Sequence, residues 1–204
     1  MKILVACEES QAVCKAFRAL GHEAHSCDIL PASGGHPEWH IQGDVLEQLE
    51  KEWNMIIAFP PCTYVSNAGA ARLYPTKGVL NEERYQKGLK GKEFFMRFYN
   101  ANCPKIVIEN PTPTLVFGMP KYDQVIQPFE YGHPFSKRTC LWLKGVPKLH
   151  PTKVLTEYIS WVSGGSKDGK GLPRKNKGTK IRDSVSRSKT FQGIADAMAN
   201  QWGV

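Results

Sequence analysis

The chain has 204 residues, of which 41% are hydrophobic and 23% charged, the composition of an ordinary globular domain. No apolar run approaches the length of a membrane span, so we expect no membrane contact. Six cysteines stand singly, without a Cys-x-x-Cys pair. This argues against a zinc ribbon and a disulfide framework, and it predicts a reduced, cytoplasmic protein.

Short apolar stretches bounded by turn residues predict strands along most of the chain. The expected strands cover residues 2–7, 23–27, 41–44, 54–59, 105–109 and 139–143. The fourth of these ends at Pro60-Pro61, because proline cannot continue a central strand. Residues 31–40 and 60–80 are rich in turn residues and are expected to be loops.

Helical spacing of apolar residues predicts helices between these strands. Ser10 is the expected N-cap of the first helix and Gly21 its end, and Asn81 is the expected cap of a long helix reaching about residue 100. A short helix is expected at 45–52 and a C-terminal helix at 191–202. Strands that alternate with helices predict a single α/β domain, residues 1–204, with a mostly parallel central sheet flanked by helices.

Polar side chains follow nearly every predicted strand, at the edge where open α/β sheets bind ligands. They are Glu8 and Glu9, Asp28, Asp44, Pro60-Pro61-Cys62, and Glu109-Asn110. A carboxylate in such a position also serves often as a helix cap, so each residue taken alone has a structural explanation.

The order of these motifs resembles the DNA cytosine-C5 methyltransferases, S-adenosylmethionine-dependent enzymes of class I, Rossmann-like fold. Pro60-Pro61-Cys62 is similar to the Pro-Cys nucleophile loop of that family, and Glu109-Asn110 to its Glu-Asn motif. Arg138 lies where the family has an arginine-containing strand. The resemblance covers roughly residues 1–145 and lacks the family's large target-recognition region, which indicates a minimal, phage-type relative.

The chemistry of cytosine methylation agrees with these residue types. Carbon C5 becomes nucleophilic when a thiolate adds to C6 and an acid protonates N3. Cys62 and Glu109 are the expected nucleophile and acid, and Arg138 would hold the base oxygen or a phosphate. The structural alternatives are a small buried hydrophobe for Cys62, an ion pair for Glu109 and a surface salt bridge for Arg138.

The resemblance implies S-adenosylmethionine as cofactor. Asp28 is expected to accept from the ribose hydroxyls, Asp44 to face the adenine amine, and Glu8 or Glu9 to lie near the methionine moiety, with Pro60 beside them. A loop over the cofactor would bring Trp39 against the adenine. The irregular spacing of the nearby histidines does not predict a metal site.

The charge is unevenly distributed. The net charge of the chain is +8, yet residues 1–50 hold three basic and eight acidic groups, whereas residues 164–189 hold nine basic groups and two acidic ones. We expect this tract to be a flexible insert that contacts the nucleic-acid backbone. The expected contacts are Arg174, Lys175, Lys177, Lys180 and Arg182. A solvated loop is the alternative; DNA is the expected partner, and no obligate protein partner is indicated.

Two other functions remain open at this stage. The first loop, residues 6–11, contains no glycine where the family has a glycine-rich loop. The chain could therefore be a catalytically inactive nucleic-acid-binding protein of the same fold. It could also be a methyltransferase that acts on another base atom, on RNA or on a free nucleotide.

Overall fold

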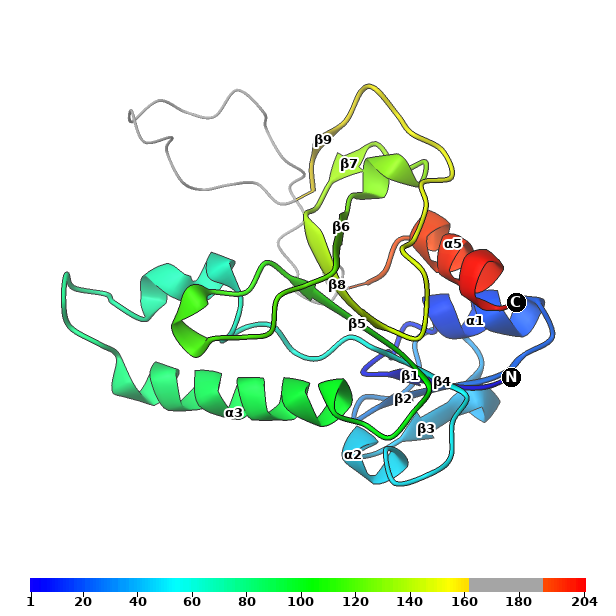
Figure 1. Cartoon of the computed structure of the whole chain (residues 1–204), viewed down its shortest axis with the longest axis horizontal. Coiled ribbons are helices and arrows are strands. Elements are labelled where there is room, and N and C mark those ends of the chain that lie inside the picture. Colours follow the sequence, from blue (N-terminus) through cyan, green and yellow to red (C-terminus); the bar gives the residue numbers. More distant parts are fainter. Residues whose placement is uncertain (162–188) are drawn as a thin grey trace.

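The computed structural model describes residues 1–161 and 189–204, so the predicted basic contacts from Arg174 to Arg182 lie outside the described residues. Within them, a seven-stranded sheet with the order β3-β2-β1-β4-β5-β8-β6 forms the centre of the molecule (Figure 1). Its strands are β1 (Lys2–Ala6), β2 (Glu23–Asp28), β3 (His40–Gln42), β4 (Met55–Ala58), β5 (Lys105–Pro111), β6 (Gln124–Ile126) and β8 (Thr139–Lys144). All neighbours pair in parallel except β8, which runs antiparallel to both β5 and β6. The predicted α/β, Rossmann-like fold is confirmed.

The strand order places the first strand in the middle of the sheet. β1 pairs with β2 on one side and with β4 on the other, so the chain order reverses at β1. Such a switch point opens a crevice beyond the carboxyl ends of the strands, where α/β proteins bind ligands. The loops that follow β1, β2, β4 and β5 all meet at this edge.

Helices lie on both faces of the sheet (Figure 1), and a hydrophobic layer on each face holds them there. On one face, α1 (Ala12–Ala19) packs beside α5 (Gln192–Trp202) over the alternate residues Ile3, Val5 and Ile57. On the other face, α3 (Glu82–Tyr99) and α2 (Val45–Gln48) cover the intervening residues. The strands are therefore buried on both sides, as parallel strands require.

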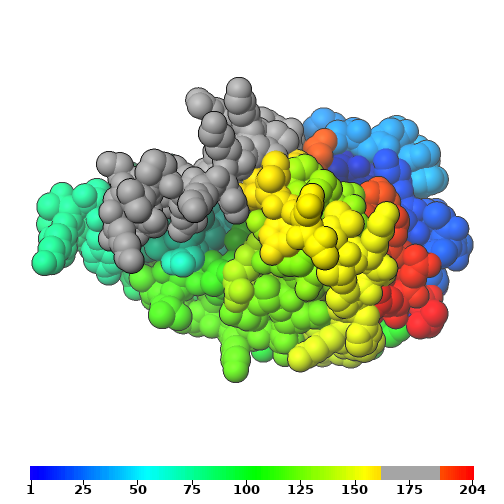
Figure 2. Space-filling model, turned by 90° about the horizontal axis from the view of Figure 1, so that it is seen from above, coloured from blue at the N-terminus to red at the C-terminus, as the bar shows by residue number. Residues whose placement is uncertain are grey.

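The C-terminal helix closes one end of the molecule. Figure 2 shows α5 (red) between the N-terminal segment (blue) and residues 145–160 (yellow). The indole of Trp202 donates to the carbonyl of Pro147 at 3.0 Å, and the backbone of His150 exchanges two hydrogen bonds with the side-chain amide of Gln201. A small parallel pair, β7 (Phe135–Ser136) with β9 (Ile159–Ser160), lies nearby.

Several local predictions are corrected. The helix expected at 45–52 ends at Gln48. The expected loops contain the 3-10 helices η1 (Pro37–Trp39) and η2 (Asn67–Arg72), and η3 (Leu115–Phe117), η4 (Pro128–Glu130) and strand β6 were not anticipated. These pieces are too short to show a periodic pattern in the sequence. Among the described residues, no helix is long and apolar enough to cross a membrane.

Candidate functional site

The loop after β1 has the backbone shape that glycine usually provides, although it contains none. Cys7 and Gln11 have φ values of 59° and 58°, in the left-handed region. Such conformations cost on the order of 1–3 kcal/mol for a residue with a side chain, and they gather at functional sites. The loop therefore forms a tight turn at the switch point even though it contains no glycine.

Glu8, rather than Ser10, caps the first helix. Its carboxylate accepts hydrogen bonds from the backbone N–H groups of Val13 at 2.7 Å and Cys14 at 3.2 Å. Burial raises the pKa of Glu8 to about 7, against the lowering effect of these two bonds. Since both carboxylate oxygens serve the helix, Glu8 fixes the first loop, and its contact with a methionine moiety stays a prediction.

The segment after β2 lies against the first loop. Ser33 donates from its backbone N–H to the carbonyl of Glu9 at 2.8 Å and from its hydroxyl to the Glu9 carboxylate. The side-chain amide of Gln11 bonds both the N–H and the carbonyl of His36, at 3.0 and 2.7 Å. A Cβ at Gly34 would fall 2.5 Å from that of Gln11, so only glycine allows this close approach.

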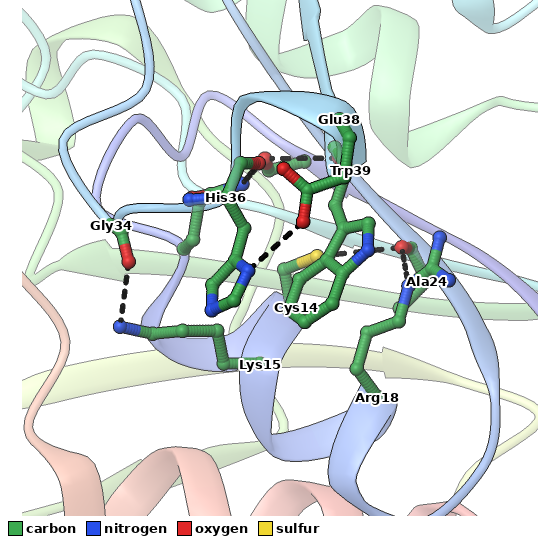
Figure 3. A network of polar contacts seen from close by, with 10 residues as sticks. Cys14, Lys15, Arg18, Ala24, Gly34, His36, Glu38 and Trp39 are labelled. Carbon is green, nitrogen blue, oxygen red and sulfur yellow. Dashed lines mark hydrogen bonds and ion pairs between the residues drawn. The ribbon is translucent and has the colours of Figure 1, made fainter.

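Trp39 is held on the side of α1 (Figure 3). Its ring stacks on His36 with centroids 3.8 Å apart, and the Arg18 guanidinium lies 5.1 Å from its centroid. Arg18 in turn donates to the carbonyl of Ala24 at 2.7 Å. Trp39 precedes the amino end of β3, whereas Asp44 follows its carboxyl end. Trp39 therefore lies at the other end of β3 from Asp44, and its contact with the adenine stays a prediction.

Two predicted cofactor acids lie around Cys7. Burial and the charges of Asp28 and Asp44 all raise the pKa of the Cys7 thiol. Asp28 ends β2 and accepts from the N–H of Leu30, while Asp44 caps α2 through the N–H of Leu46, both at 2.9 Å. Asp44 thus fills the capping role that was its alternative explanation. The structure brings both carboxylates to one edge, where they can accept from hydroxyl or amine groups.

The loop with the candidate nucleophile is tied to the neighbouring strand. Asn110 donates from Nδ2 to the carbonyl of Pro60 at 2.9 Å. The Cys62 carbonyl accepts from the N–H of Ser66 at 2.9 Å, and the Cys62 side chain is half-buried. From α3, Arg84 donates to the carbonyl of Thr63, also at 2.9 Å. Cys62 therefore lies in a braced loop at the ligand-binding edge and not in the core.

The antiparallel pairing of β5 with β8 places Pro111 opposite Thr139, so Arg138, just before β8, lies beside the residues that follow Glu109. Burial of the Glu109 carboxyl group raises its pKa, while the charge of Lys137 and a hydrogen bond with Thr139 lower it. The exposed Arg138 donates from Nε to the Thr112 hydroxyl and from Nη2 to that of Tyr122, both at 3.0 Å.

Sequence reasoning missed three residues of this group: Thr112, Lys137 and Thr139. Lys137 and Thr139 flank Arg138 in the chain. The β5–β8 register places Thr139 opposite Pro111, and the charge of Lys137 acts on Glu109. The positive charge of Lys137 and the hydrogen bond from the Thr139 hydroxyl both lower the pKa of the Glu109 carboxyl group. Within residues 1–161 and 189–204, no cluster of metal-ligating side chains is present.

Comparison with known proteins adds little. No family model and no curated protein matches the chain. Among solved structures, the Entamoeba histolytica methyltransferase EhMeth is similar, with a TM-score of 0.46 and 14% sequence identity. The similarity covers 75% of this chain and 57% of that one, so the chain spans little more than half the length of that protein.

Proposed function

We propose that the chain is an S-adenosylmethionine-dependent DNA cytosine-C5 methyltransferase with Cys62 as nucleophile. The observation that carries this proposal is the hydrogen bond from Asn110 to Pro60, because it couples the Cys62 loop to the strand end that holds Glu109. A thiol and a carboxylic acid thus follow neighbouring strands at the carboxyl edge of the sheet, which supports their use on the two sides of a pyrimidine ring.

The roles of these residues follow from their surroundings. The Cys62 thiolate would add to C6 of cytosine while Glu109 gives a proton to N3, so that C5 can take the methyl group and S-adenosylhomocysteine leaves. Loss of the C5 proton and elimination of the Cys62 thiolate from C6 would then restore the aromatic ring. A raised pKa suits Glu109 for this role because the carboxyl group then holds its proton more readily than an exposed one and can act as the acid. Arg138 holds the exocyclic oxygen of the base or an adjacent phosphate.

The described residues fit the cofactor. S-adenosylmethionine supplies an electrophilic methyl group and presents ribose hydroxyls and an adenine amine, all hydrogen-bond donors. Asp28 and Asp44 provide acceptors for these donors near the first turn. Glu9 belongs to that turn, and its carboxylate accepts from the hydroxyl of Ser33 in the segment after β2. Pro60 begins the loop and accepts a hydrogen bond from Asn110, and we expect it to contact the cofactor.

Nucleoside mass spectrometry tests the proposal. DNA incubated with the protein and methyl-deuterated S-adenosylmethionine should yield labelled 5-methyldeoxycytidine, and the Cys62→Ser variant should yield none. Labelled N4-methyldeoxycytidine or N6-methyldeoxyadenosine would assign the chain to another methyltransferase class. Labelling of RNA or of a free nucleotide, but not of DNA, would change the substrate.

A separate titration distinguishes the non-enzymatic alternative. If calorimetry detects binding of DNA but none of S-adenosylmethionine, the chain is a nucleic-acid-binding protein and the methyltransferase proposal is wrong. The two carboxylates near Cys7 and the completed first turn lead us to expect cofactor binding.

A further inference from the structure

Leu115 is exposed to an unusual degree for an apolar side chain in an ordered turn. It begins the short helix η3 and is 96% exposed, and its neighbour Val116 is 40% exposed. Single exposed apolar residues are common on protein surfaces. Leu115 differs from such residues because the turn that carries it is firmly held and because this turn lies beside the Cys62 loop.

The turn that carries Leu115 is firmly held. Thr114 caps it through the N–H of Val116 and donates its own N–H to the carbonyl of Val65 at 2.8 Å. Phe117 is 4% exposed and stacks on Tyr85 of α3 with centroids 5.6 Å apart. Gly118 ends the turn with φ of 54°, in the left-handed region that favours glycine. The turn thus presents Leu115 to solvent from a fixed base.

This turn lies beside the Cys62 loop. The N–H of Asn67 donates to the carbonyl of Thr112 at 2.8 Å, and Ser66 pairs with Pro113 in an antiparallel bridge. Residues 112–114 are therefore joined by backbone contacts to residues 65–67, three to five positions beyond Cys62. Leu115 is the first residue past this joint.

Two cations lie near the two ends of the segment that carries Leu115. Arg138 binds the Thr112 hydroxyl at one end, and at the other the Lys92 ammonium lies 4.0 Å from the position of a Cβ on Gly118. An apolar side chain on a segment with positive charges near its ends suits a polyanion with an apolar interior, such as stacked bases between phosphates. If the partner were an apolar protein surface, the charges of Arg138 and Lys92 would have no role in binding it.

We propose that Leu115 inserts into the base stack of duplex DNA when the target cytosine is flipped out; this inference rests on the proposed function. A flipped base leaves a gap, and enzymes lose a few kcal/mol of stacking and pairing for it. An apolar wedge recovers part of this free energy by filling the gap, as apolar side chains do in proteins that kink DNA. In single-stranded DNA there is no stack to enter, so the wedge has no effect there.

The experiment compares Leu115→Ala with wild type on duplex and single-stranded DNA of the same sequence. We expect kcat/KM on the duplex to fall roughly tenfold, since the truncation removes a few methyl-sized groups of apolar surface. On the single strand we expect less than about a twofold change. Leu115→Phe should retain activity on the duplex, and equal melting temperatures should show that the variants fold.

Val204→Ala is the matched control. Val204 is 92% exposed, and its carbonyl accepts from Lys105, which begins β5 at the opposite edge of the sheet. Its truncation should change neither rate.

The outcomes separate the two proposals. If Leu115→Ala lowers kcat/KM equally on both DNA forms, or does not lower it on the duplex, the wedge proposal is wrong. Methylation of DNA by the wild type would still support the proposed enzyme function. A loss of self-association with unchanged rates on both DNA forms would assign Leu115 to a protein interface instead. A wild type active only on single strands also overturns the wedge, and one that methylates neither form overturns both proposals.

Discussion

Asn110, near the end of β5, donates a hydrogen bond across 2.9 Å to the backbone carbonyl of Pro60, just past the end of β4. The Asn110 side chain is 3% exposed, and within the described part of the chain its Oδ1 has no hydrogen-bond partner. A buried acceptor left without a partner is costly, by about 1–3 kcal/mol. The Asn110 amide therefore contributes more to the position of the Cys62 loop than to the stability of the fold.

The first prediction concerns this bond. Asn110→Ala should lower kcat for methyl transfer by at least tenfold, because the Cys62 loop loses its tie to the Glu109 strand and small misplacements of reacting groups are costly. Unfolding in urea should show a loss of no more than about 2 kcal/mol, since the orphan oxygen is removed together with the donor.

Asn81→Ala is the control for the Asn110 variant. Asn81 caps α3 through the N–H of Arg84 at 3.0 Å, and its loss should cost about 1 kcal/mol of stability. If Asn81→Ala lowers kcat as much as Asn110→Ala, the effect reflects stability alone and the positioning role is wrong.

The second prediction concerns the nucleophile. DNA that contains 5-fluorocytosine should form a covalent adduct with the protein, because fluorine at C5 blocks the final elimination and the bond to C6 persists. Cys62→Ser should abolish the adduct. Cys103→Ser should retain it, since Cys103 is 3% exposed and its thiol donates to the carbonyl of Trp53, a bond that a serine hydroxyl can also make. Peptide mapping that places the adduct on another cysteine would refute the assignment.

The third prediction concerns the cofactor. Asp28→Ala should weaken S-adenosylmethionine binding by about 1.5–3 kcal/mol in calorimetry, the range for a hydrogen bond to a charged group. Asp28→Asn keeps an acceptor without the charge and should lose less. Asp123→Ala removes a carboxylate that accepts from the N–H of Leu143 in the antiparallel part of the sheet, and it should leave binding unchanged.

The fourth prediction concerns pH and Glu8. Burial raises the pKa of Glu8 from 4.5 to about 7, so the folded state binds more protons than the unfolded chain between these values. The contribution of Glu8 to the free energy of unfolding therefore falls as pH rises from 4.5 to 7, by about 3 kcal/mol, and then stays constant.

Urea titrations at pH 5 and pH 8 measure this contribution. Glu8→Gln cannot ionise, so its stability should drop less than that of wild type between the two pH values. Glu93→Gln, at an exposed position of α3, should keep the wild-type drop. Identical pH dependence in wild type and Glu8→Gln would show that the Glu8 carboxyl group titrates normally.

The fifth prediction concerns the basic tract outside the described residues. Neutralising Arg174, Lys175, Lys177 and Lys180 together should weaken DNA binding across all sequences. The slope of log affinity against log salt should flatten by roughly 0.9 for each phosphate of duplex DNA that the variant no longer neutralises. Methyl transfer to a free nucleotide, if the chain catalyses it, should not change. An unchanged salt slope would show that other residues hold the phosphates.

The sequence by itself determined the fold class and the contents of the ligand-binding edge. Apolar runs such as Met55–Ala58, stopped by Pro60-Pro61, identify buried parallel strands whose ends bring Asp28, Cys62 and Glu109 to one edge. This succeeds because strand periodicity and proline chemistry are local properties of the chain.

Only the tertiary structure decided how the residues at that edge are used. Glu8 caps α1 because Gln11 takes a left-handed conformation, and Trp39 packs against Arg18 and His36. The contact of Thr139 with Glu109 depends on the β5–β8 register, and the exposure of Leu115 depends on backbone contacts with residues 65–67. These outcomes arise from contacts between residues distant in the chain, and a local pattern carries no information about such contacts.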